Sequence, residues 1–582
     1  MWDLYRRLRR RKIVQWTLAY VAAAALVIGL LADVSSGFPW GVRILRVTVA
    51  VAAVGVVITL VVGWYHGEWG RQRVTRTELF LLGGLGLAAG GAGWIAATTT
   101  DLAGPTAEEL PEIVASSPED GVRVAVLPCE AMPLDSTTEY LALGLADQVI
   151  AQLSRLGRVR PMALSSIQSY AYGDRDIREI ATDLKVAAVL DCTLRSDGER
   201  VRTTAHLFDA QGGETLWSEP YTREIGDILG LEAEIALRIA EAVTDGLTST
   251  ERDRIDRPPP TLVEDAWLDY LRGQQVGGAT EERIQAAIGY YERAIERDPE
   301  FALAHAGLGR AFTELGLLGL RPPRESRDTA RAAARRALRL DDELGEAHAV
   351  LGGLLHKFDW DWEEADAAFR RAVWLSPSSY MVHDSYGHFL ILMGRSEEGI
   401  AEYREALALD PMNPMAHALL AWAFLHSDRA EEAVEQGLET LERFPEFQIS
   451  RLPLAWSLAE LGRYEKAVAE VERVAPFLRD DPQLRATNAA LYAAAGRGEE
   501  ARQILGSLQE LAERRYVDPI NFAYIYSALG DTLVALDYLE EAYRLGSPIM
   551  PFIKTEEFGF ILNTIRPHPR FQELMQKMRF PE

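Results

Sequence analysis

Cysteine is scarce in this sequence, and only Cys129 and Cys192 occur among its 582 residues. Two cysteines exclude a disulfide-dense scaffold and any zinc site made of cysteines alone. Both fall at or near the ends of strands predicted for one sheet. They are therefore either two buried thiols or a single disulfide, and the sequence leaves both readings open.

Short motifs of catalysis are missing as well. The chain contains no GxxxxGK[ST], GxSxG, HExxH or CxxC pattern, the spacings at which phosphate cradles, serine nucleophiles, zinc proteases and redox dithiols are found. Carboxylates are plentiful, but they lie on helix faces that we expect to be solvated. We predict no enzyme, with no catalytic residue, no cofactor and no metal.

Positive charge is lacking beyond the first part of the chain. The first 100 residues hold 11 Lys or Arg against four acidic residues, so of the net charge of −25 the rest of the chain carries −32. Such a surface repels phosphate backbones. We therefore expect no binding of nucleic acid.

Long apolar runs do occur, at residues 13–32, 47–65 and 79–97, and none of them contains an ionised side chain. Each is long enough to cross a hydrocarbon core as a helix. The sequence predicts a membrane anchor over 1–97 with three transmembrane helices. The bias of Lys and Arg places the N-terminus in the cytoplasm, which implies a multi-pass protein of the inner membrane with its soluble domains in the periplasm.

After a polar linker at 98–121, the pattern changes to that of an α+β domain at 122–250. β-branched strands are expected at 122–129, at 159–163, on both sides of "SDGE" and at "ETLWSEPY". Helical periodicity covers 136–157, 175–186 and 225–247. The predicted order is βαβαβββα, a sheet covered by helices.

The blocks "VAVLPCEAM", "EYLALGLADQVIAQLSRL" and "DILGLEAEIALRIAEAV" resemble the TolB amino-terminal-like domain of bacterial proteins. The resemblance implies a non-catalytic module that contacts other proteins. Members of that family usually have Phe at the place of Cys129 and Gly near Cys192, so both cysteines depart from its pattern.

A second resemblance covers 263–582, beyond a Pro/Arg-rich linker at 251–262. A small residue recurs at steps of 43, 35 and then 34 residues, at Ala287, Ala330, Ala365, Gly399, Ala433, Ala467, Ala501 and Ala535. This period resembles the tetratricopeptide repeat, a pair of helices that buries its apolar face only by stacking on its neighbours. We predict about eight repeats and a C-terminal capping helix. The predicted fold class is multi-domain, with three transmembrane helices, the α+β domain and an all-α solenoid wound as a right-handed superhelix.

Two positions of the repeat hold candidate site residues. The fourth position carries His305, His348, His383 and His417. A ladder of metal ligands is excluded there, because neighbouring helices are about 8–10 Å apart and a zinc–nitrogen bond is about 2 Å long. The ninth position is expected to face the concave side of the array, and it carries His388, Trp422, Trp456 and Tyr524.

Aromatic side chains on a concave face are typical of binding sites. We therefore predict that this face, together with Arg310 and Asp384, contacts a partner. The alternative is that Trp422 and Trp456 complete the packing between repeats.

The predicted function is a membrane-anchored, non-enzymatic scaffold that binds a protein or peptide partner in the concave groove, with envelope assembly or signalling as candidate settings. A sensory receptor whose extracytoplasmic domains bind a ligand is the alternative; partner and oligomeric state are not indicated.

Overall fold

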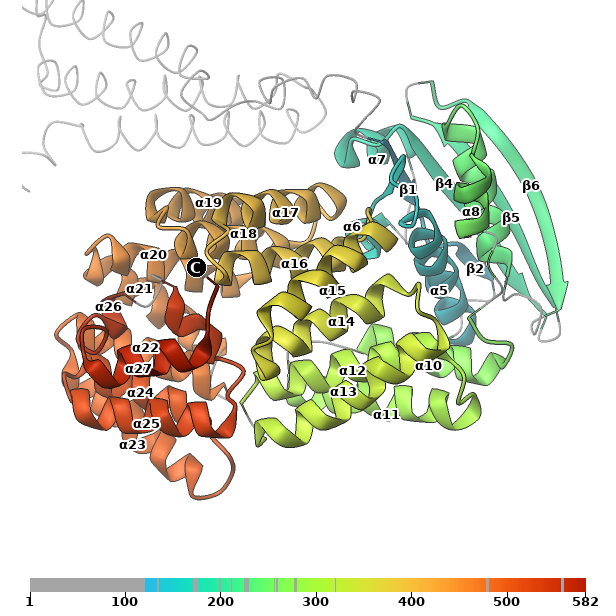
Figure 1. Ribbon diagram of the computed structural model, residues 1–582. Helices are drawn as coiled ribbons and strands as arrows, with labels where there is room; N and C mark the ends of the chain where they lie inside the picture. The colour runs from blue at the N-terminus through green and yellow to red at the C-terminus, as the bar shows by residue number, and fades with distance from the viewer. Residues whose placement is uncertain are drawn as a thin grey trace, which may run out of the picture. The chain divides into compact units, whose positions relative to one another are not determined.

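The computed structural model describes residues 121–582, and its described part belongs to one compact unit, Pro118–Glu582 (Figure 1). Within this range it leaves out 133–135, 171–175, 198–199, 211, 225–229, 256, 258–259, 277–279, 320, 478–480, 556–558 and 582.

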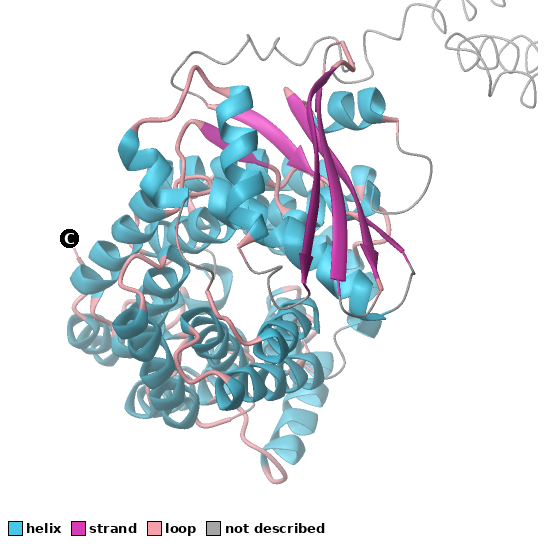
Figure 2. Ribbon diagram, turned by 90° about the vertical axis from the view of Figure 1, so that its right-hand side faces the viewer, coloured by secondary structure: helices cyan, strands magenta, loops and turns pink. Residues whose placement is uncertain are grey.

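A single sheet forms the N-terminal part of this unit. Its strands are β1 (Val122–Val126), β2 (Glu130–Met132), β3 (Val159–Pro161), β4 (Ala188–Ser196), β5 (Arg200–Asp209) and β6 (Thr215–Glu224). The order is β3-β1-β4-β5-β6, and β2 pairs with β4. β1 lies parallel to β3 and β4, whereas β4, β5 and β6 form an antiparallel meander, shown in magenta in Figure 2.

Helices cover this sheet, and side chains along its strands accordingly alternate between buried and solvated. In β5, Val201, Thr203, Ala205 and Leu207 are buried while their neighbours are more exposed, the period of two that marks a strand with one covered face. Helices α5 (Ser136–Leu153) and α8 (Leu231–Val243) pack against each other, and α5 also contacts β1. α7 (Ile177–Leu184) contacts β4.

The two cysteines form a disulfide. The register of β2 and β4 pairs Glu130 with Thr193, so the residues that precede this pair are neighbours as well. The Cα atoms of Cys129 and Cys192 lie 4.5 Å apart, and the two sulfur atoms are bonded. Parallel pairing thus decides between the two readings that the sequence left open.

Eight helix pairs follow in the described part of the chain. They are α10 (Glu264–Val276) with α11 (Glu281–Arg297), α12 (Ala302–Leu317) with α13 (Pro323–Leu340), α14 (Gly345–Leu354) with α15 (Trp362–Leu375), α16 (Tyr380–Leu392) with α17 (Ser396–Leu409), α18 (Pro414–His426) with α19 (Ala430–Arg443), α20 (Arg451–Glu460) with α21 (Tyr464–Val474), α22 (Pro482–Ala494) with α23 (Gly498–Ala512), and α24 (Pro519–Ala528) with α25 (Thr532–Leu545). All eight small residues of the 34-residue period lie on the second helix of a pair and are buried. At Gly399 an added Cβ would lie 3.0 Å from the carbonyl oxygen of Gly387, so the helices of that pair approach too closely for a side chain there.

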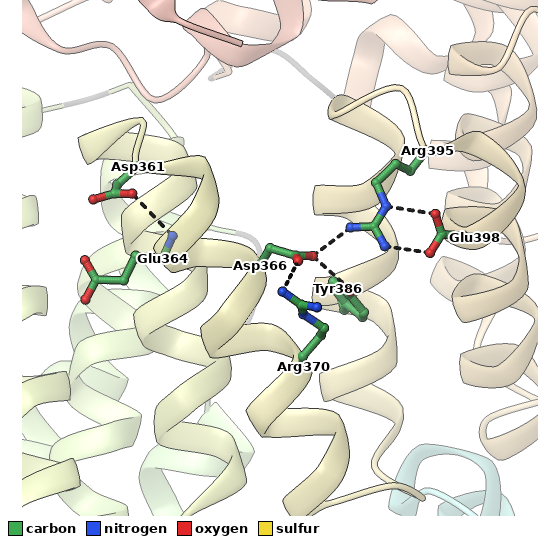
Figure 3. A network of polar contacts seen from close by, with 7 residues as sticks. All are labelled: Asp361, Glu364, Asp366, Arg370, Tyr386, Arg395 and Glu398. Carbon is green, nitrogen blue, oxygen red and sulfur yellow. Dashed lines mark hydrogen bonds and ion pairs between the residues drawn. The ribbon is translucent and has the colours of Figure 1, made fainter. Parts of the chain in front are cut away.

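Arginines link consecutive repeats in a way that the period alone did not reveal. Arg395 lies directly before α17. Its guanidinium donates to Glu398 in the first turn of α17 and, at 2.8 Å, to Asp366 of the preceding repeat (Figure 3). The hydroxyl of Tyr386 donates to the same Asp366 at 3.0 Å. Arg429 and Arg497 stand at the equivalent position and make the same two kinds of contact. These ion pairs join three of the repeats to the repeat before them.

The sheet domain packs directly on the first repeats. Gly144 of α5 lies against Leu271 of α10 so closely that an added Cβ would be 2.2 Å from Leu271 Cδ1, and one hydrophobic core runs from the sheet into α10, α11 and α12. Further along the array, the Ser166 hydroxyl donates to Asp410 and accepts from the amide of Met412 at 2.9 Å. α5 therefore lies between the sheet and the first helices of the array (Figure 1).

The C-terminal segment returns to the middle of the array. The indole of Trp362 donates to the carbonyl of Met578 at 3.0 Å and stacks on Phe580 with ring centroids 5.0 Å apart. Lys554, in the short helix η7 (Met550–Lys554), donates to the carbonyl of Met393 at 3.0 Å. α27 (Pro569–Met578) buries Phe571 and Leu574 in the same core as α15, α16 and α24. The segment thus joins repeats that are far apart in sequence.

The predicted fold class needs a correction. In the part of the chain that the structure describes, no helix is long and apolar enough to cross a membrane, so a fold with three transmembrane helices is not supported. The longest described helices, α5 and α13, have 18 residues, and charged side chains such as Asp147 and Arg331 interrupt them. The segments 13–32, 47–65 and 79–97 lie outside the described residues. What is supported is an all-helical repeat solenoid in the C-terminal part, preceded by the sheet domain.

Candidate functional site

Three of the predicted site residues line one cavity. His388, Trp422 and Trp456 occupy equivalent positions on the first helices α16, α18 and α20, so stacking of the repeats brings them together. The rings of Trp422 and Trp456 meet edge to face, with centroids 4.3 Å apart. Trp456 is only 3% exposed, whereas Trp422 and His388 are half-buried. The cavity beside them has a volume of about 200 Å³.

Phe552 completes this cavity from outside the repeats. It belongs to η7, and its ring centroid lies 5.5 Å from that of His388 and 5.9 Å from that of His426. His426 in turn stacks on Trp422. Sequence reasoning missed Phe552 because it lies beyond the last repeat, where the 34-residue period gives no signal. We name the group His388, Trp422, His426, Trp456 and Phe552 the aromatic cavity.

The imidazole of His388 adds no charge to the aromatic cavity near pH 7. Burial, with smaller contributions from the charges of Lys357 and His426, holds the pKa of His388 well below its usual value. The imidazole therefore carries no charge. Its neighbour His356 is fully buried, 5.6 Å from His388 between ring centroids, and burial lowers its pKa in the same way. The cavity can take an apolar or aromatic group with little electrostatic cost.

Asp384 is on α16, one turn before His388, but it does not line the aromatic cavity, and its carboxylate interacts electrostatically with Lys357. Burial raises the pKa of Asp384 to about 6, although the charge of Lys357 acts in the opposite direction. Its Oδ1 atom is buried and accepts no hydrogen bond from the described residues. The folded-state pKa lies above the ordinary 3.8, so the folded protein holds the proton of Asp384 more tightly than the unfolded chain does. The stability that this proton contributes to the fold is complete at low pH and is lost as the pH rises towards 6.

We therefore expect Asp384→Asn to stabilise the protein at pH 7.5, by about 1 kcal/mol. The gain stays below that implied by the pKa shift, because the substitution also removes the attraction that helps to keep Lys357 protonated. Melting temperatures of variant and wild type between pH 4.5 and 8 measure it, and the difference should shrink towards low pH. Asp342→Asn, at an exposed site, is the control. A pH-independent difference for Asp384→Asn would contradict the prediction.

The remaining predicted site residues lie elsewhere. Tyr524 is fully buried in the core that α24 shares with α15, α16 and the C-terminal segment, because η7 and α26 (Gly559–Leu562) cover this end of the array. Arg310 lines two other cavities, next to α5. Five of the six predicted residues are thus divided among the aromatic cavity, a hydrophobic core and the junction with the sheet domain, and Asp384 lies in none of the three.

The four histidines at the fourth position do not gather around a common point. Nε2 of His305, His348, His383 and His417 lies 2.8–3.1 Å from a carbonyl oxygen six residues earlier, at the turn that begins the same repeat. Each imidazole therefore fixes the entry into its own first helix. His383 also contacts Glu402 through Nδ1. Burial by itself would lower the pKa of His383, but the contacts with Glu402 and with the carbonyl of Pro377 together raise it. These histidines have a structural role that recurs with the repeat.

This architecture defines a class, that of helical-repeat solenoids built from pairs of helices. A family model described as "Tetratricopeptide repeat" matches residues 280–320 and 393–446. Those residues cover α11 and α12, and α17 to α19. The chain therefore contains tetratricopeptide repeats, as the spacing of small residues predicted.

One curated relative is the "Putative adenylate cyclase 3" of Rhizobium meliloti (strain 1021), 29% identical over 211 residues, which are 35% of this chain and 35% of that protein. The chain thus spans about a third of the length of this relative.

Among solved structures, a thermophilic TPR protein of Thermus thermophilus is 22% identical, with 33% of this chain and 99% of that chain covered and a TM-score of 0.29. The type IV pilus biogenesis factor PilW is 18% identical, with 41% and 98% covered and a TM-score of 0.30. The human IFIT1 dimer is 14% identical, with 59% and 78% covered and a TM-score of 0.39. All three TM-scores are below 0.5.

Proposed function

We propose that this protein is a non-enzymatic scaffold that binds a protein or peptide partner through the aromatic cavity of its repeat array. The observation that carries the proposal is the convergence of Trp422, Trp456 and Phe552 on one cavity of about 200 Å³. A space of this size accepts one aromatic or large aliphatic side chain. Aromatic groups that enclose such a space supply large contact areas at a low cost in conformational entropy.

The neutral state of His388 supports an apolar occupant. A charged side chain would lose its hydration in the aromatic cavity without gaining an ion pair, whereas an apolar side chain would bury its surface against the rings. A peptide segment with an aromatic or large aliphatic residue is therefore the expected ligand. The resemblance of 122–250 to TolB amino-terminal-like domains adds a second surface at which protein contacts are expected.

Selection of peptides from a random library against the full-length protein tests this function. Selected peptides are expected to share a large apolar residue, and Trp422→Ala should weaken their binding at least tenfold, because a hot-spot aromatic contributes on the order of 2 kcal/mol. Trp374→Ala is the matched control, since Trp374 is 53% exposed and lies on α15, outside the aromatic cavity. Isothermal titration calorimetry gives the affinities, and circular dichroism checks that both variants are folded.

Peptides that bind wild type and Trp422→Ala with equal affinity would contradict the proposal and place the partner site elsewhere. A loss that appears equally in Trp374→Ala would also contradict it, because that residue does not touch the cavity.

We further propose that the described part of the chain works in an oxidising compartment, such as the bacterial periplasm. The disulfide between Cys129 and Cys192 supports this placement, since crosslinks of this kind persist in oxidising compartments and are rare in the cytosol. Both cysteines are at most 5% exposed, so the crosslink is part of the domain core.

A further inference from the structure

A second, polar site lies where α5 of the sheet domain faces the first helices of the array. Two adjoining cavities of about 260 and 380 Å³ occur there, and Asp147, Gln274 and Arg310 line both of them. α10, α12 and α14 supply one wall and α5 the other. These volumes lie on either side of the lower limit for ligand pockets, roughly 300 Å³. The two cavities share no lining residue with the aromatic cavity.

Arg310 offers an anion-binding group to this space. Its Nη2 atom donates to Gln274 and, at 3.3 Å, to the hydroxyl of Tyr291, while Nε lies 3.9 Å from a carboxylate oxygen of Glu314. Among the described residues, Nη1 in contrast has only the thioether of Met381 as a partner, at 3.5 Å, and sulfur of this kind is a weak acceptor. The side chain remains 34% exposed. The guanidinium is thus fixed in place by Gln274 and Tyr291, while Nη1 is available to a carboxylate.

Asp147, on the opposite wall, offers a cation-binding group. Among the described residues this carboxylate takes part in no hydrogen bond and no direct ion pair, although it feels the charges of Arg310 and Glu346. Burial raises the pKa of Asp147 to about 6, so ionisation near pH 7 leaves a charge with too little stabilisation. An ammonium group beside this carboxylate would supply the missing positive charge and a hydrogen-bond donor.

The arrangement of charges selects for a ligand that carries both signs. Glu346 on α14 adds a second negative charge near Asp147. This second charge disfavours a simple anion such as phosphate. Arg310 disfavours a simple cation. We propose that this site binds a small zwitterion of the α-amino acid class, with its carboxylate on Arg310 and its ammonium group on Asp147.

Such a ligand would connect the two parts of the described chain. Its carboxylate would be held by α12 and its ammonium group by α5, so binding stabilises the docking of the sheet domain on the first repeats. Tyr270 contributes to the same wall, where its hydroxyl accepts a hydrogen bond from Gln274 at 2.9 Å. Binding of the small molecule would thereby control how firmly the sheet domain docks on the repeat array.

Thermal shift and calorimetric titration of the full-length protein with each of the twenty common L-amino acids test the proposal. At least one is expected to raise the melting temperature. For that amino acid, the amide that lacks the carboxylate and the acid that lacks the amino group should each bind at least tenfold more weakly. Asp147→Asn should cause the same loss, and it removes no hydrogen bond between described residues, so folding is expected to be retained. Asp384→Asn, which changes a buried carboxylate outside this site, should leave binding unchanged.

Arg310→Lys separates charge from geometry, because lysine keeps the positive charge and loses the planar guanidinium. A tenfold or greater loss of affinity is expected from it. The proposal is overturned if none of the twenty amino acids binds, if the amide and the des-amino acid bind as well as the parent, or if Asp147→Asn binds like wild type. Because Trp422 does not line this site, failure here would leave the peptide function of the aromatic cavity unaffected.

Discussion

Trp456→Ala is expected to reduce the free energy of unfolding of the repeat array by about 3–5 kcal/mol, the range for deletion of a buried large aromatic side chain. Trp456 is 3% exposed and belongs to the core that α16, α18 and α20 share. Its ring also meets that of Trp422 edge to face, an arrangement that contributes beyond the burial of area. Urea unfolding followed by circular dichroism measures the loss.

Trp422→Ala should cost less, because Trp422 is half-buried and already faces the aromatic cavity. A double-mutant cycle of the two tryptophans is expected to give a coupling of about 0.5–1.5 kcal/mol. The exposed Trp374 again supplies the control, with a change within about 0.5 kcal/mol. If Trp456→Ala unfolds no more readily than Trp374→Ala, then Trp456 is not part of the core. The two tryptophans thus differ in their surroundings, since Trp456 is buried in the core between repeats whereas the half-buried Trp422 lines the aromatic cavity.

The repeat array could be predicted from the sequence because its physical cause is local and recurrent. Each pair of helices needs a small residue at its crossing point, and that need leaves a mark every 34 residues. Ala433 and Ala467 show this directly, since both are fully buried on second helices. The fourth-position histidines follow the same rule, because each one bonds to a carbonyl within its own repeat.

The composition of the site could be predicted only in part, because contacts between distant segments leave no periodic mark. Phe552 lines the aromatic cavity from η7, and Asp147 lines the same cavity as Arg310 but belongs to a different domain. Tyr524 has the right position in its repeat, but the C-terminal segment covers that end of the array and buries it. A position within a repeat therefore predicts which side of a helix a residue occupies, but not what lies opposite.

The cysteine pair shows the same limit on a smaller scale. Strand positions could be assigned from β-branched runs, yet pairing of Cys129 with Cys192 depends on the register of β2 on β4. A shift of one residue in that register would turn one of the side chains to the other face of the sheet. The observed register places the two Cα atoms 4.5 Å apart, within the range that a disulfide requires.

Loss of this crosslink is expected to have an effect comparable to that of Trp456→Ala. The two cysteines are 63 residues apart in sequence, and closing a loop of that length is worth about 4 kcal/mol in the chain-entropy description. In Cys129→Ala/Cys192→Ala, the protection of β4 and β5 amides against hydrogen exchange should therefore fall by two to three decades, since about 1.4 kcal/mol corresponds to a factor of ten. The repeats from α18 to α23, which lie outside the core that the sheet shares with α10, α11 and α12, should exchange as in wild type.

Reduction supplies the matched control, because it breaks the bond and keeps both side chains. Dithiothreitol should weaken protection in wild type to the level of the double variant and leave the double variant unchanged. In cells quenched with acid and then alkylated, the two cysteines should react only after reduction, as an oxidising compartment requires. Equal protection in wild type and the double variant would show that the strands hold the domain without the crosslink. Alkylation without prior reduction would place this part of the chain in a reducing compartment and end the proposal of a periplasmic location.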